Sequence, residues 1–529
     1  MRRLAPAVIL LLLALPGAAQ AGTHQLRIFQ DDGMLVYSGP LVRAAVLDQA
    51  KAMGVDAIRV QFVWRNIALS KPASPTDPNA YGSAWSNWDS LVLDAHKRHL
   101  KVLATVTGPA PTWAAGTTAG YYTGSRYPRP KAFAQFMTAV GRRYSGHAKA
   151  AVAAKSAGVL DPCTPVPPLI TCGPSGPVVT PPPPAPAPGG GSPPPQSPPP
   201  PPSGGGGTDQ SPPPPPGSGT PTPPPPAGTR LPRISLWSIY NEPNHPLFLS
   251  PQRRKGVLTS PSLYRALYRA GWKALARTGH RRDTILMGEV LPIGSNANRE
   301  TATTSPLRFA RELFCLNGSG RRHPGCRGRF AALHASGWAI HAYYRKTGPF
   351  SRPPGRDDVT PATIGHMRAM LVRARRTGRL RGRAVLWDTE DGSQTRPPDP
   401  KGASLKRQAR FINEAEYLAW RMPFMRSFSQ YLWIDEKPVW AFQSGLFFAN
   451  GKPKPALASY RLPIYVKKSG SGVVVWGHVP RAGIVTITRS RGRAVRVHAR
   501  NYFAKRLAGQ ARSYRLRFGR WASRRAAPR

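Results

Sequence analysis

Acidic residues are scarce in this chain of 529 residues: 24 Asp and Glu stand against 75 Lys and Arg, a formal net charge of +51. Such an excess favours anionic partners: wall polymers, acidic polysaccharides, membrane surfaces or nucleic acid. The basic residues are spread along the whole chain, and zinc-finger, RNP and basic-zipper patterns are missing, so specific nucleic-acid recognition is not expected. A coding bias towards Arg, Ala, Pro and Gly would give the same composition. We therefore expect only a loose association with anionic cell-wall polymers.

Cysteine is scarce as well, with four residues in two close pairs. Their spacing predicts the local disulfides Cys163–Cys172 and Cys315–Cys326, which would suit an exported protein. Neither pair has CxxC spacing, so we expect no metal site and no cofactor.

Long apolar runs are limited to the start of the chain. Residues 1–21 combine a basic start, a short apolar core and the small-x-small site Ala19-Gln20-Ala21, a pattern typical of a secretory signal. We expect cleavage near Gly22 and a secreted protein that is extracellular or associated with the cell wall. An uncleaved N-terminal anchor is the alternative. No later stretch is long and apolar enough to span a membrane.

Strand patterns and helical patterns alternate along most of the chain, which is typical of a parallel sheet. Strands are predicted at residues 24–29, 54–64, 101–108, 234–242, 283–290, 337–344, 383–390 and 430–436. Helices are predicted at residues 41–53, 88–99, 132–144, 263–278, 364–377 and 411–420. Eight strands with intervening helices fit one α/β fold, the (β/α)8 or TIM barrel.

Two segments do not follow this alternation. Proline runs and glycine clusters dominate residues 163–229, which predicts a disordered, partly polyproline II insertion. It follows a helix and precedes a strand, so it would lie on the N-terminal face of the barrel, away from catalysis; a linker between two domains is the alternative. Beyond Pro463, short β-branched strands predict a small C-terminal β-sandwich. The expected organisation is a signal (1–21), a barrel in two parts (22–162 and 230–463), the insertion (163–229) and a sandwich with a basic tail (464–529), as a monomer.

Carboxylates end two of the predicted strands. The stretch LWSIYNEPN ends an apolar run at Asn241-Glu242-Pro243, and RAVLWDTE ends at Glu390. Catalytic groups of TIM barrels lie at the C-terminal ends of strands, and glycoside hydrolysis needs two carboxyl groups beside the bond. An ordinary strand-to-loop junction that contains a Glu is the alternative for the LWSIYNEPN stretch alone. Asp388 and Asp391 are alternative partners, and Glu289 on the fifth strand is expected to be structural or to support the site.

These motifs resemble those of the retaining (β/α)8 glycoside hydrolases, the clan that includes cellulase-like family 5 and family 39. In that clan the acid/base Glu follows Asn on strand four, often as NEP, and the nucleophile Glu ends strand seven, often as TExG. Asn241-Glu242-Pro243 and Thr389-Glu390-Asp391-Gly392 match both patterns. The resemblance covers most of residues 24–463 apart from the insertion. It implies Glu242 as acid/base and Glu390 as nucleophile.

Further positions match the same clan. Arg59 corresponds to the strand-two arginine that keeps the nucleophile ionised, His341 and Tyr343 to the HxY of strand six, and Trp433 to the strand-eight tryptophan beneath the sugar. The predicted substrate-binding residues are Arg59, Asn241, His341, Tyr343, Trp433 and Trp113. Trp237, Tyr240 and Trp433 are expected to surround Glu242 and to favour its protonated form. A core histidine and an interior ion pair are the alternatives for His341 and Arg59.

The resemblance implies a retaining hydrolase that cleaves O-glycosidic bonds of a β-linked polysaccharide or glycoside by double displacement, and the signal-like residues 1–21 predict that it is secreted. The alternative is a non-catalytic, wall-associated glycan-binding protein that keeps the barrel as a scaffold. The sequence leaves the glycan open, because specificity lies in the loops that follow the strands.

Overall fold

The computed structural model describes residues 25–117, 122–150, 226, 228–295, 297–319, 321, 331–439 and 441–529, and the backbone of 170–173 and 176–179. The predicted signal and most of the predicted insertion lie outside the described residues. Within the insertion, β4 (Ile170–Gly173) and β5 (Gly176–Val179) pair as an antiparallel hairpin.

Eight parallel strands form the main sheet, in the order β13-β11-β9-β6-β3-β2-β1-β16. Their bounds are β1 (Leu26–Gln30), β2 (Ala57–Val63), β3 (Lys101–Thr107), β6 (Leu236–Ile239), β9 (Thr284–Val290), β11 (Gly337–His341), β13 (Leu386–Glu390) and β16 (Ser427–Tyr431). Each overlaps one predicted strand. The eighth is displaced, because the apolar run that predicted 430–436 belongs mostly to the loop after β16.

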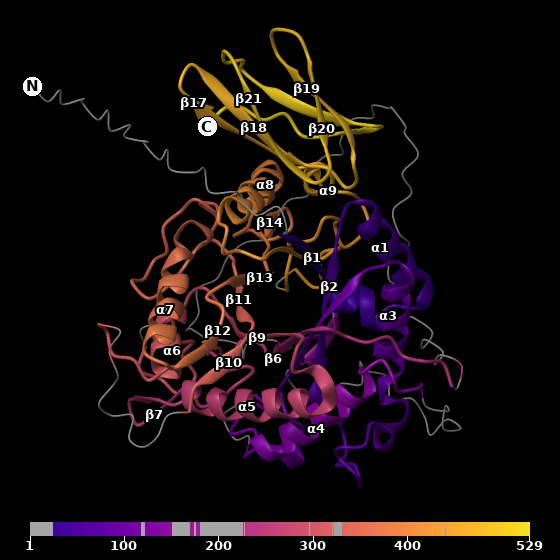
Figure 1. Cartoon of the computed structure of the whole chain (residues 1–529), viewed down its shortest axis with the longest axis vertical. Coiled ribbons are helices and arrows are strands. Elements are labelled where there is room, and N and C mark those ends of the chain that lie inside the picture. Colours follow the sequence, from indigo (N-terminus) through magenta and orange to yellow (C-terminus); the bar gives the residue numbers. More distant parts are fainter. Residues whose placement is uncertain are drawn as a thin grey trace, which may run out of the picture.

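The sheet closes between its two outer strands, β13 and β16. Leu386 donates its N–H to the carbonyl of Phe424 and accepts from the N–H of Arg426, both at 2.8 Å. Further along, the Asp388 carboxylate replaces a backbone acceptor and binds the N–H of Ser429 at 3.1 Å. Burial raises the pKa of Asp388 to about 7. These bonds leave no open edge in the sheet, so the predicted TIM barrel is present (Figure 1).

Helices surround the barrel on its outside (Figure 1). They are α1 (Pro40–Ala52), α2 (Trp64–Ile67), α3 (Ser86–Lys97), α4 (Pro130–Arg143), α5 (Ser260–Leu275), α6 (Pro306–Leu313), α7 (Gly365–Arg376), α8 (Leu405–Arg421) and α9 (Pro455–Arg461). Proline lies in the first turn of α1, α4, α5, α6 and α9, where its missing N–H removes no helical bond. In the part of the chain that the structure describes, no helix is long and apolar enough to cross a membrane.

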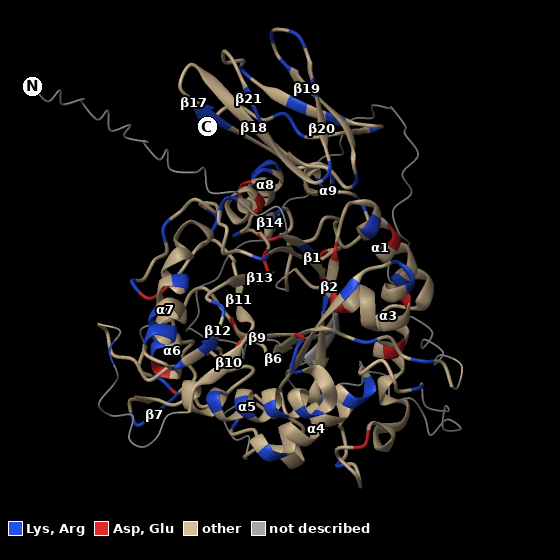
Figure 2. Cartoon of the chain, viewed as in Figure 1, with Lys and Arg blue, Asp and Glu red and all other residues tan. Residues whose placement is uncertain are grey.

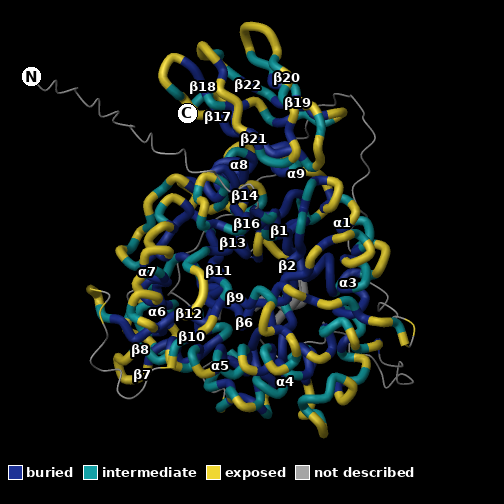
Figure 3. Tube along the Cα trace, in the orientation of Figure 1, coloured by how far each residue is buried: buried dark blue, intermediate teal, exposed yellow. Residues whose placement is uncertain are grey.

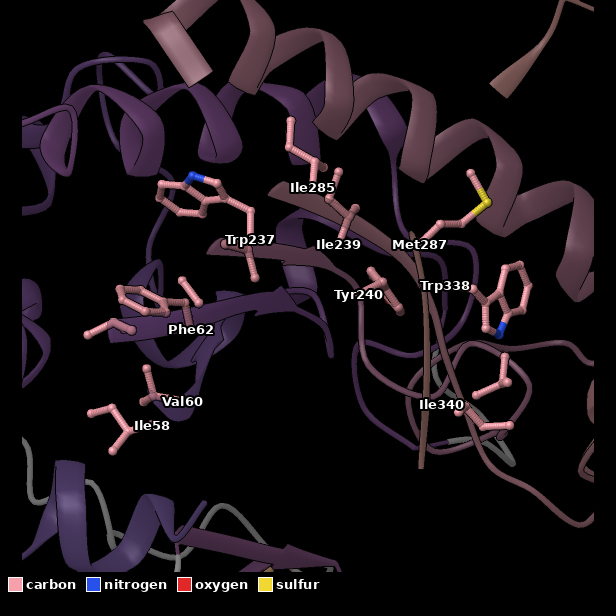
Figure 4. Close-up of a cluster of buried hydrophobic side chains, with 14 of the residues drawn as sticks. Ile58, Val60, Phe62, Trp237, Ile239, Tyr240, Ile285, Met287, Trp338 and Ile340 are labelled. Carbon is pink, nitrogen blue, oxygen red and sulfur yellow. The ribbon is translucent and has the colours of Figure 1, made fainter. Parts of the chain in front are cut away.

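Alternate side chains of each strand pack on opposite sides of the sheet. Those that face the helices form the main hydrophobic core, and Figure 4 shows ten of them labelled: Ile58, Val60, Phe62, Trp237, Ile239, Tyr240, Ile285, Met287, Trp338 and Ile340. A second cluster consists of the alternate residues: Ile28, Ala57, Leu103, Leu236, Leu286, Ala339 and Trp387. This cluster fills the barrel near the start of its strands. Buried residues therefore occupy the centre of the barrel, and exposed ones lie in its outer loops and helices (Figure 3).

Two antiparallel sheets follow the barrel and enclose a core of their own. The first contains β17 (Ile464–Ser469), β18 (Gly472–His478) and β21 (Tyr502–Leu507). The second contains β19 (Gly483–Arg489), β20 (Val495–Ala499), β22 (Tyr514–Phe518) and β23 (Trp521–Ala522). This arrangement matches the predicted sandwich, which lies next to α8 and α9 in Figure 1.

Side chains of α8 join the sandwich to the barrel. Tyr417 stacks on Tyr465 of β17 with ring centroids 4.0 Å apart. Glu416 binds Arg27 of β1 at 2.8 Å and accepts a hydrogen bond from Tyr502 of β21 at 3.0 Å.

Lys and Arg are spread over both the barrel and the sandwich, as Figure 2 shows, rather than gathered on one recognition helix.

Candidate active site

Three glutamates come together where strands of the barrel end. Glu242 follows β6, Glu289 lies near the end of β9, and Glu390 is the last residue of β13. Their side chains are 12%, 0% and 8% exposed, respectively, so Glu242 and Glu390 reach the surface of the site while Glu289 lies beneath it.

Two β-bulges turn Glu289 and Glu390 into the barrel. Strict alternation would place Glu289 on the same outer face as Met287, and Glu390 on that of Asp388. Instead, the pairing of β9 with β11 passes over Glu289, and the pairing of β11 with β13 passes over Thr389. In β9 the extra residue is Glu289, which itself projects inwards. In β13 the extra residue is Thr389, which reverses the face of the next residue, Glu390. Bulges near active sites redirect side chains in this way.

The first bulge depends on Gly288. Its φ of +112° favours glycine, and a Cβ there would lie 2.6 Å from the carbonyl oxygen of Ala339. Non-glycine residues with positive φ also gather at this end of the barrel: Tyr240 (72°), Glu242 (40°), Glu289 (50°) and Leu432 (75°). Such conformations cost about 1–3 kcal/mol each and persist only where surrounding contacts hold them.

Glu390 accepts hydrogen bonds on both of its oxygens. Arg59 donates from Nη1 to Oε2 at 2.8 Å, and Tyr343 donates from Oη to Oε1 at 2.6 Å. Burial raises the pKa of Tyr343 well above its usual range, so the phenol stays a donor. An ionised carboxylate is the form that accepts on both oxygens, and these donors hold it at a fixed orientation.

Arg59 lies on β2 and is fully buried beneath the glutamates. Besides Glu390 it binds Asn241 Oδ1 at 2.7 Å and Glu289 Oε2 at 3.1 Å, and it also contacts Gln30. Burial alone would lower the pKa of Arg59, but the charges of Glu289 and Glu390 outweigh it and raise that pKa. Arg59 thus orients the glutamates from below and is not among the residues that line the cavity.

His341, the last residue of β11, bridges two of the glutamates. Its Nδ1 lies 2.7 Å from Glu242 Oε1, and its Nε2 lies 2.9 Å from Glu289 Oε2. Burial disfavours the charged ring, but the charge of Glu390 and the bonds to Glu242 and Glu289 outweigh it and raise the pKa of His341 to about 10. With a carboxylate at each nitrogen, both nitrogens donate and the ring is an imidazolium.

This protonation state bears on metal binding. One atom each from Glu242, His341 and Glu390 lie within 4.8 Å of one another, a spacing that a metal ion could bridge. A histidine ligand must offer a free lone pair, however, and an imidazolium has none. Metal binding and the imidazolium are therefore alternative states of this cluster.

Glu289 is the most buried of the three carboxylates. Burial favours its neutral form, but the charge of Arg59 and the bond with His341 outweigh this and lower the pKa of Glu289 to about 2. Thr389 adds a hydrogen bond from Oγ1 at 2.7 Å. From the sequence, Glu289 was expected to have only a structural or supporting role. The signal that could have found it is an apolar strand that ends in Glu, which it shares with Glu242 and Glu390.

A cavity of about 740 Å³ opens above these residues. This volume lies within the range of small-molecule sites, roughly 300–1,000 Å³. Glu242, Glu390, Asn241 and Tyr343 line it at the catalytic end. Acidic, basic and aromatic side chains from strand ends, short helices and loops add to the lining, including Asp32, Glu436, Arg65, Lys346, Lys401, Tyr37, Phe248, Tyr344, Tyr431 and Phe442.

The structure corrects the expected position of Trp433. This residue is fully buried, packs against Phe29 and Phe447 with ring centroids 5.4 Å away in each case, and does not line the cavity. The reason is the displaced eighth strand, which ends at Tyr431 rather than after Trp433. Tyr431 and Phe442 lie edge to face at 5.4 Å and supply the aromatic lining there.

The other predicted aromatic residues also lie away from the cavity. Trp113 is half-buried, packs edge-on against Trp64 and donates to the carbonyl of Ala68 at 3.1 Å. Trp237 and Tyr240 are fully buried in the core that faces the helices, so neither surrounds Glu242 as expected. Alternation along β6 explains Trp237, which points away from the barrel interior. Tyr240 follows β6 with a φ of 72°, and its hydroxyl donates to the carbonyl of Phe248 at 2.9 Å.

Aspartates beside Glu390 and the cysteine pairs are the remaining candidates. Neither Asp388 nor Asp391 lines the cavity, which disfavours both as alternatives to Glu390.

Cys315 is disulfide-bonded, but Cys326 and Cys163 lie outside the described residues and only the backbone of Cys172 is described. Both cysteine pairings stay predictions.

No protein-family model and no curated protein matches this sequence. Among solved structures, it is similar to a glucosidase from Croceicoccus marinus, with 10% identity and a TM-score of 0.43 over 92% of this chain and 81% of that one. It is also similar to Fpglu1 from Fervidobacterium pennivoraus, with 10% identity and a TM-score of 0.42 over 83% and 94%. The virulence factor SghA from Agrobacterium tumefaciens has 13% identity and a TM-score of 0.39 over 77% and 80%.

Proposed function

We propose that this chain is a retaining glycoside hydrolase, with Glu390 as nucleophile and Glu242 as acid/base. The observation that carries the proposal is the pair of carboxylates at the cavity, which have one oxygen each within 4.8 Å of the other. Retaining enzymes hold their two carboxyl groups about 5–5.5 Å apart, whereas inverting enzymes separate them by about 6.5–9.5 Å to admit a water molecule.

The surroundings of each carboxylate suit these two roles. Glu390 is held by donors on both oxygens, as a nucleophile that must attack as an anion requires. Among the described residues, the side chain of Glu242 has one hydrogen-bond partner, the protonated ring of His341, so it lies next to a source of protons. In the first step Glu390 attacks the anomeric carbon and forms a glycosyl ester while Glu242 protonates the leaving oxygen. In the second step Glu242 takes a proton from a water molecule that attacks the same carbon, and the bond between this carbon and Glu390 breaks.

The aromatic lining supports a sugar as the substrate. Phe442 is 41% exposed although it is large and apolar, and it lines the cavity beside Tyr431. We propose that these two rings take the place of the strand-eight tryptophan as the platform for a sugar ring. The β-linkage is part of this proposal, and the panel of aryl glycosides described next identifies the sugar.

The first prediction concerns Glu390. The mature protein is expected to hydrolyse one or more aryl β-glycosides in a panel of glucosides, glucuronides, xylosides and mannosides, and Glu390→Ala should lower kcat by at least about a thousandfold, since it removes the nucleophile. A 2-fluoro glycoside of the preferred sugar should label the peptide that contains Glu390, as mass spectrometry would show. The control is Asp391→Asn, a substitution at the residue that follows Glu390 in the sequence.

Several outcomes would contradict the proposal. Turnover that survives Glu390→Ala, or a first-formed product with inverted anomeric configuration by NMR, would exclude the retaining mechanism. Glycan binding without any turnover, unchanged in Glu242→Gln, would favour the non-catalytic glycan-binding alternative.

We also propose that the protein is exported and associates loosely with anionic wall polymers. The signal-like residues 1–21 and the net charge of +51 support this. N-terminal sequencing of the protein from culture medium and from a high-salt wash of the cells would test both points.

A further inference from the structure

Glu289 is an ionised carboxylate that the double displacement does not use. Its side chain is fully buried and does not line the cavity, so it cannot contact a substrate there. An unpaired buried charge costs several kcal/mol, and even a paired one adds little stability compared with an apolar residue of similar size. Its contacts indicate what it does instead.

These contacts form a line that ends at the proposed acid/base. Arg59, Thr389 and His341 all meet the same oxygen of Glu289, at 3.1, 2.7 and 2.9 Å. The opposite nitrogen of His341 then meets Glu242 at 2.7 Å. The bulge at Glu289 and the glycine before it are needed to aim this carboxylate at the ring.

We propose that Glu289 is a positioning residue that acts through His341. It holds the Nε2–H of the ring, and His341 thereby stores at Nδ1 the proton that Glu242 gives to the leaving group. This inference rests on the proposed function, because it assigns the source of the proton in that reaction.

The proton transfer leaves the total charge of the cluster unchanged. The N–H bond at Nδ1 breaks as an O–H bond forms at Glu242 Oε1, and the neutral ring keeps its other proton on Nε2, bonded to Glu289. Glu242 then protonates the leaving oxygen. In the second step Glu242 takes a proton from the attacking water and returns it to Nδ1, which restores the imidazolium.

Charged and titratable groups face His341 from all the strands around it. They are Arg59 on β2, Glu242 after β6, Glu289 on β9, Asp388 and Glu390 on β13, and Tyr343 just beyond β11. Three of these, Glu242, Glu289 and Glu390, are carboxylates in contact with the ring or within 3.8 Å of it. They raise the pKa of His341 to about 10 against the effect of burial, so the store is full at neutral pH.

The test is the pH dependence of kcat/KM in Glu289→Gln. Glutamine keeps an acceptor for Nε2–H but removes the negative charge, so the imidazolium loses its proton at a lower pH. The alkaline limb of the profile reports this loss and should move down by about one unit or more, as expected for removal of an opposite charge in contact. An unchanged limb in a folded variant would overturn the proposal and leave Glu289 with a structural role.

Glu416→Gln provides a matched control. Glu416 is another fully buried glutamate that binds a fully buried arginine, Arg27, at 2.8 Å, but it lies between the barrel and the sandwich. This variant should lose stability and keep the alkaline limb of the wild type. A shift of equal size in the control would show that the limb follows stability and not the proton store.

A second measurement needs no variant of Glu289. In protein with ¹⁵N-labelled histidine, both ring nitrogens of His341, assigned by loss of the signals in His341→Gln, should be protonated at pH 8. A bare nitrogen at pH 8 would overturn the proposal even if Glu289→Gln fails to fold. Wild-type turnover is measured separately: a chain that cleaves no glycoside refutes the proposed function, while the nitrogen signals still report the state of His341.

Discussion

Glu242, Glu289 and Glu390 are the same residue type and differ only in what surrounds them. Glu390 has a donor on each oxygen, Glu242 has the imidazolium on one oxygen, and Glu289 is sealed beneath both. The sequence could identify Glu242 and Glu390, because each lies in a short motif at a strand end. It could not assign a role to Glu289, because the burial and the hydrogen-bond partners of this side chain come from other strands.

Tyr343 offers a direct test of how Glu390 is held. Tyr343→Phe removes the hydrogen bond at 2.6 Å and should lower kcat/KM roughly tenfold to a hundredfold, the effect of losing a bond of about 1.5–3 kcal/mol to a charged group. Tyr344→Phe is the control, since Tyr344 also lines the cavity and has no described hydrogen bond to Glu390. Equal losses in both variants would mean that the hydroxyl of Tyr343 has no special role.

At the level of single strands, local irregularities decide which side chains enter the site. Alternation correctly predicts the core face of β2, β6 and most of β9, as Figure 4 shows. It fails at Glu289 and Glu390, where bulges shift the pairing. The position that the resemblance implied for Trp433 is wrong because the strand ends earlier than the apolar run. Pairing with neighbouring strands fixes both features, so a single strand's sequence does not reveal them.

The loop after β16 leads to a prediction about substrate binding. Phe442→Ala should raise KM about threefold to tenfold with little change in kcat, because a ring–sugar contact is worth about 0.5–1.5 kcal/mol. Phe350→Ala is the matched control: Phe350 is 43% exposed, against 41% for Phe442, and packs near Tyr465 outside the cavity. A KM that stays unchanged in Phe442→Ala would exclude this ring from the platform.

On the scale of the whole molecule, the site depends on closure of the barrel. Arg59, Glu242, Glu289, His341 and Glu390 come from five different strands or strand ends between residues 59 and 390, and the ring of strands brings them together. The sandwich does not line the cavity; it packs on α8 through Glu416 and Tyr417. Its described contacts are therefore with the outside of the barrel rather than with the cavity.

The charge network predicts how stability varies with pH. The pKa of His341 rises from 6.5 to about 10 on folding, so its contribution is fully present below pH 6.5 and is lost as the pH rises through 10. The pKa of Glu289 falls from 4.5 to about 2, so its contribution is present above pH 4.5 and is lost as the pH falls through 2.

Urea unfolding at pH 6.5 and pH 10 would check the first of these effects. The wild type should lose more free energy of unfolding between the two values than His341→Gln does, because the variant lacks the shifted group. His366→Gln, an exposed position on α7, should behave like the wild type. A loss of equal size in His341→Gln would show that other groups cause it.

The sequence by itself determined the barrel, its eight strands in order, the C-terminal sandwich and the glutamates at the ends of the fourth and seventh strands. These features follow from local periodicity and short motifs, which act over a few residues. Tertiary structure decided the bulges, the end of the eighth strand, the burial of Trp433 and the line from Glu289 through His341 to Glu242. Those depend on how neighbouring strands pair and on which charges are buried together, and residues far apart in the chain set both.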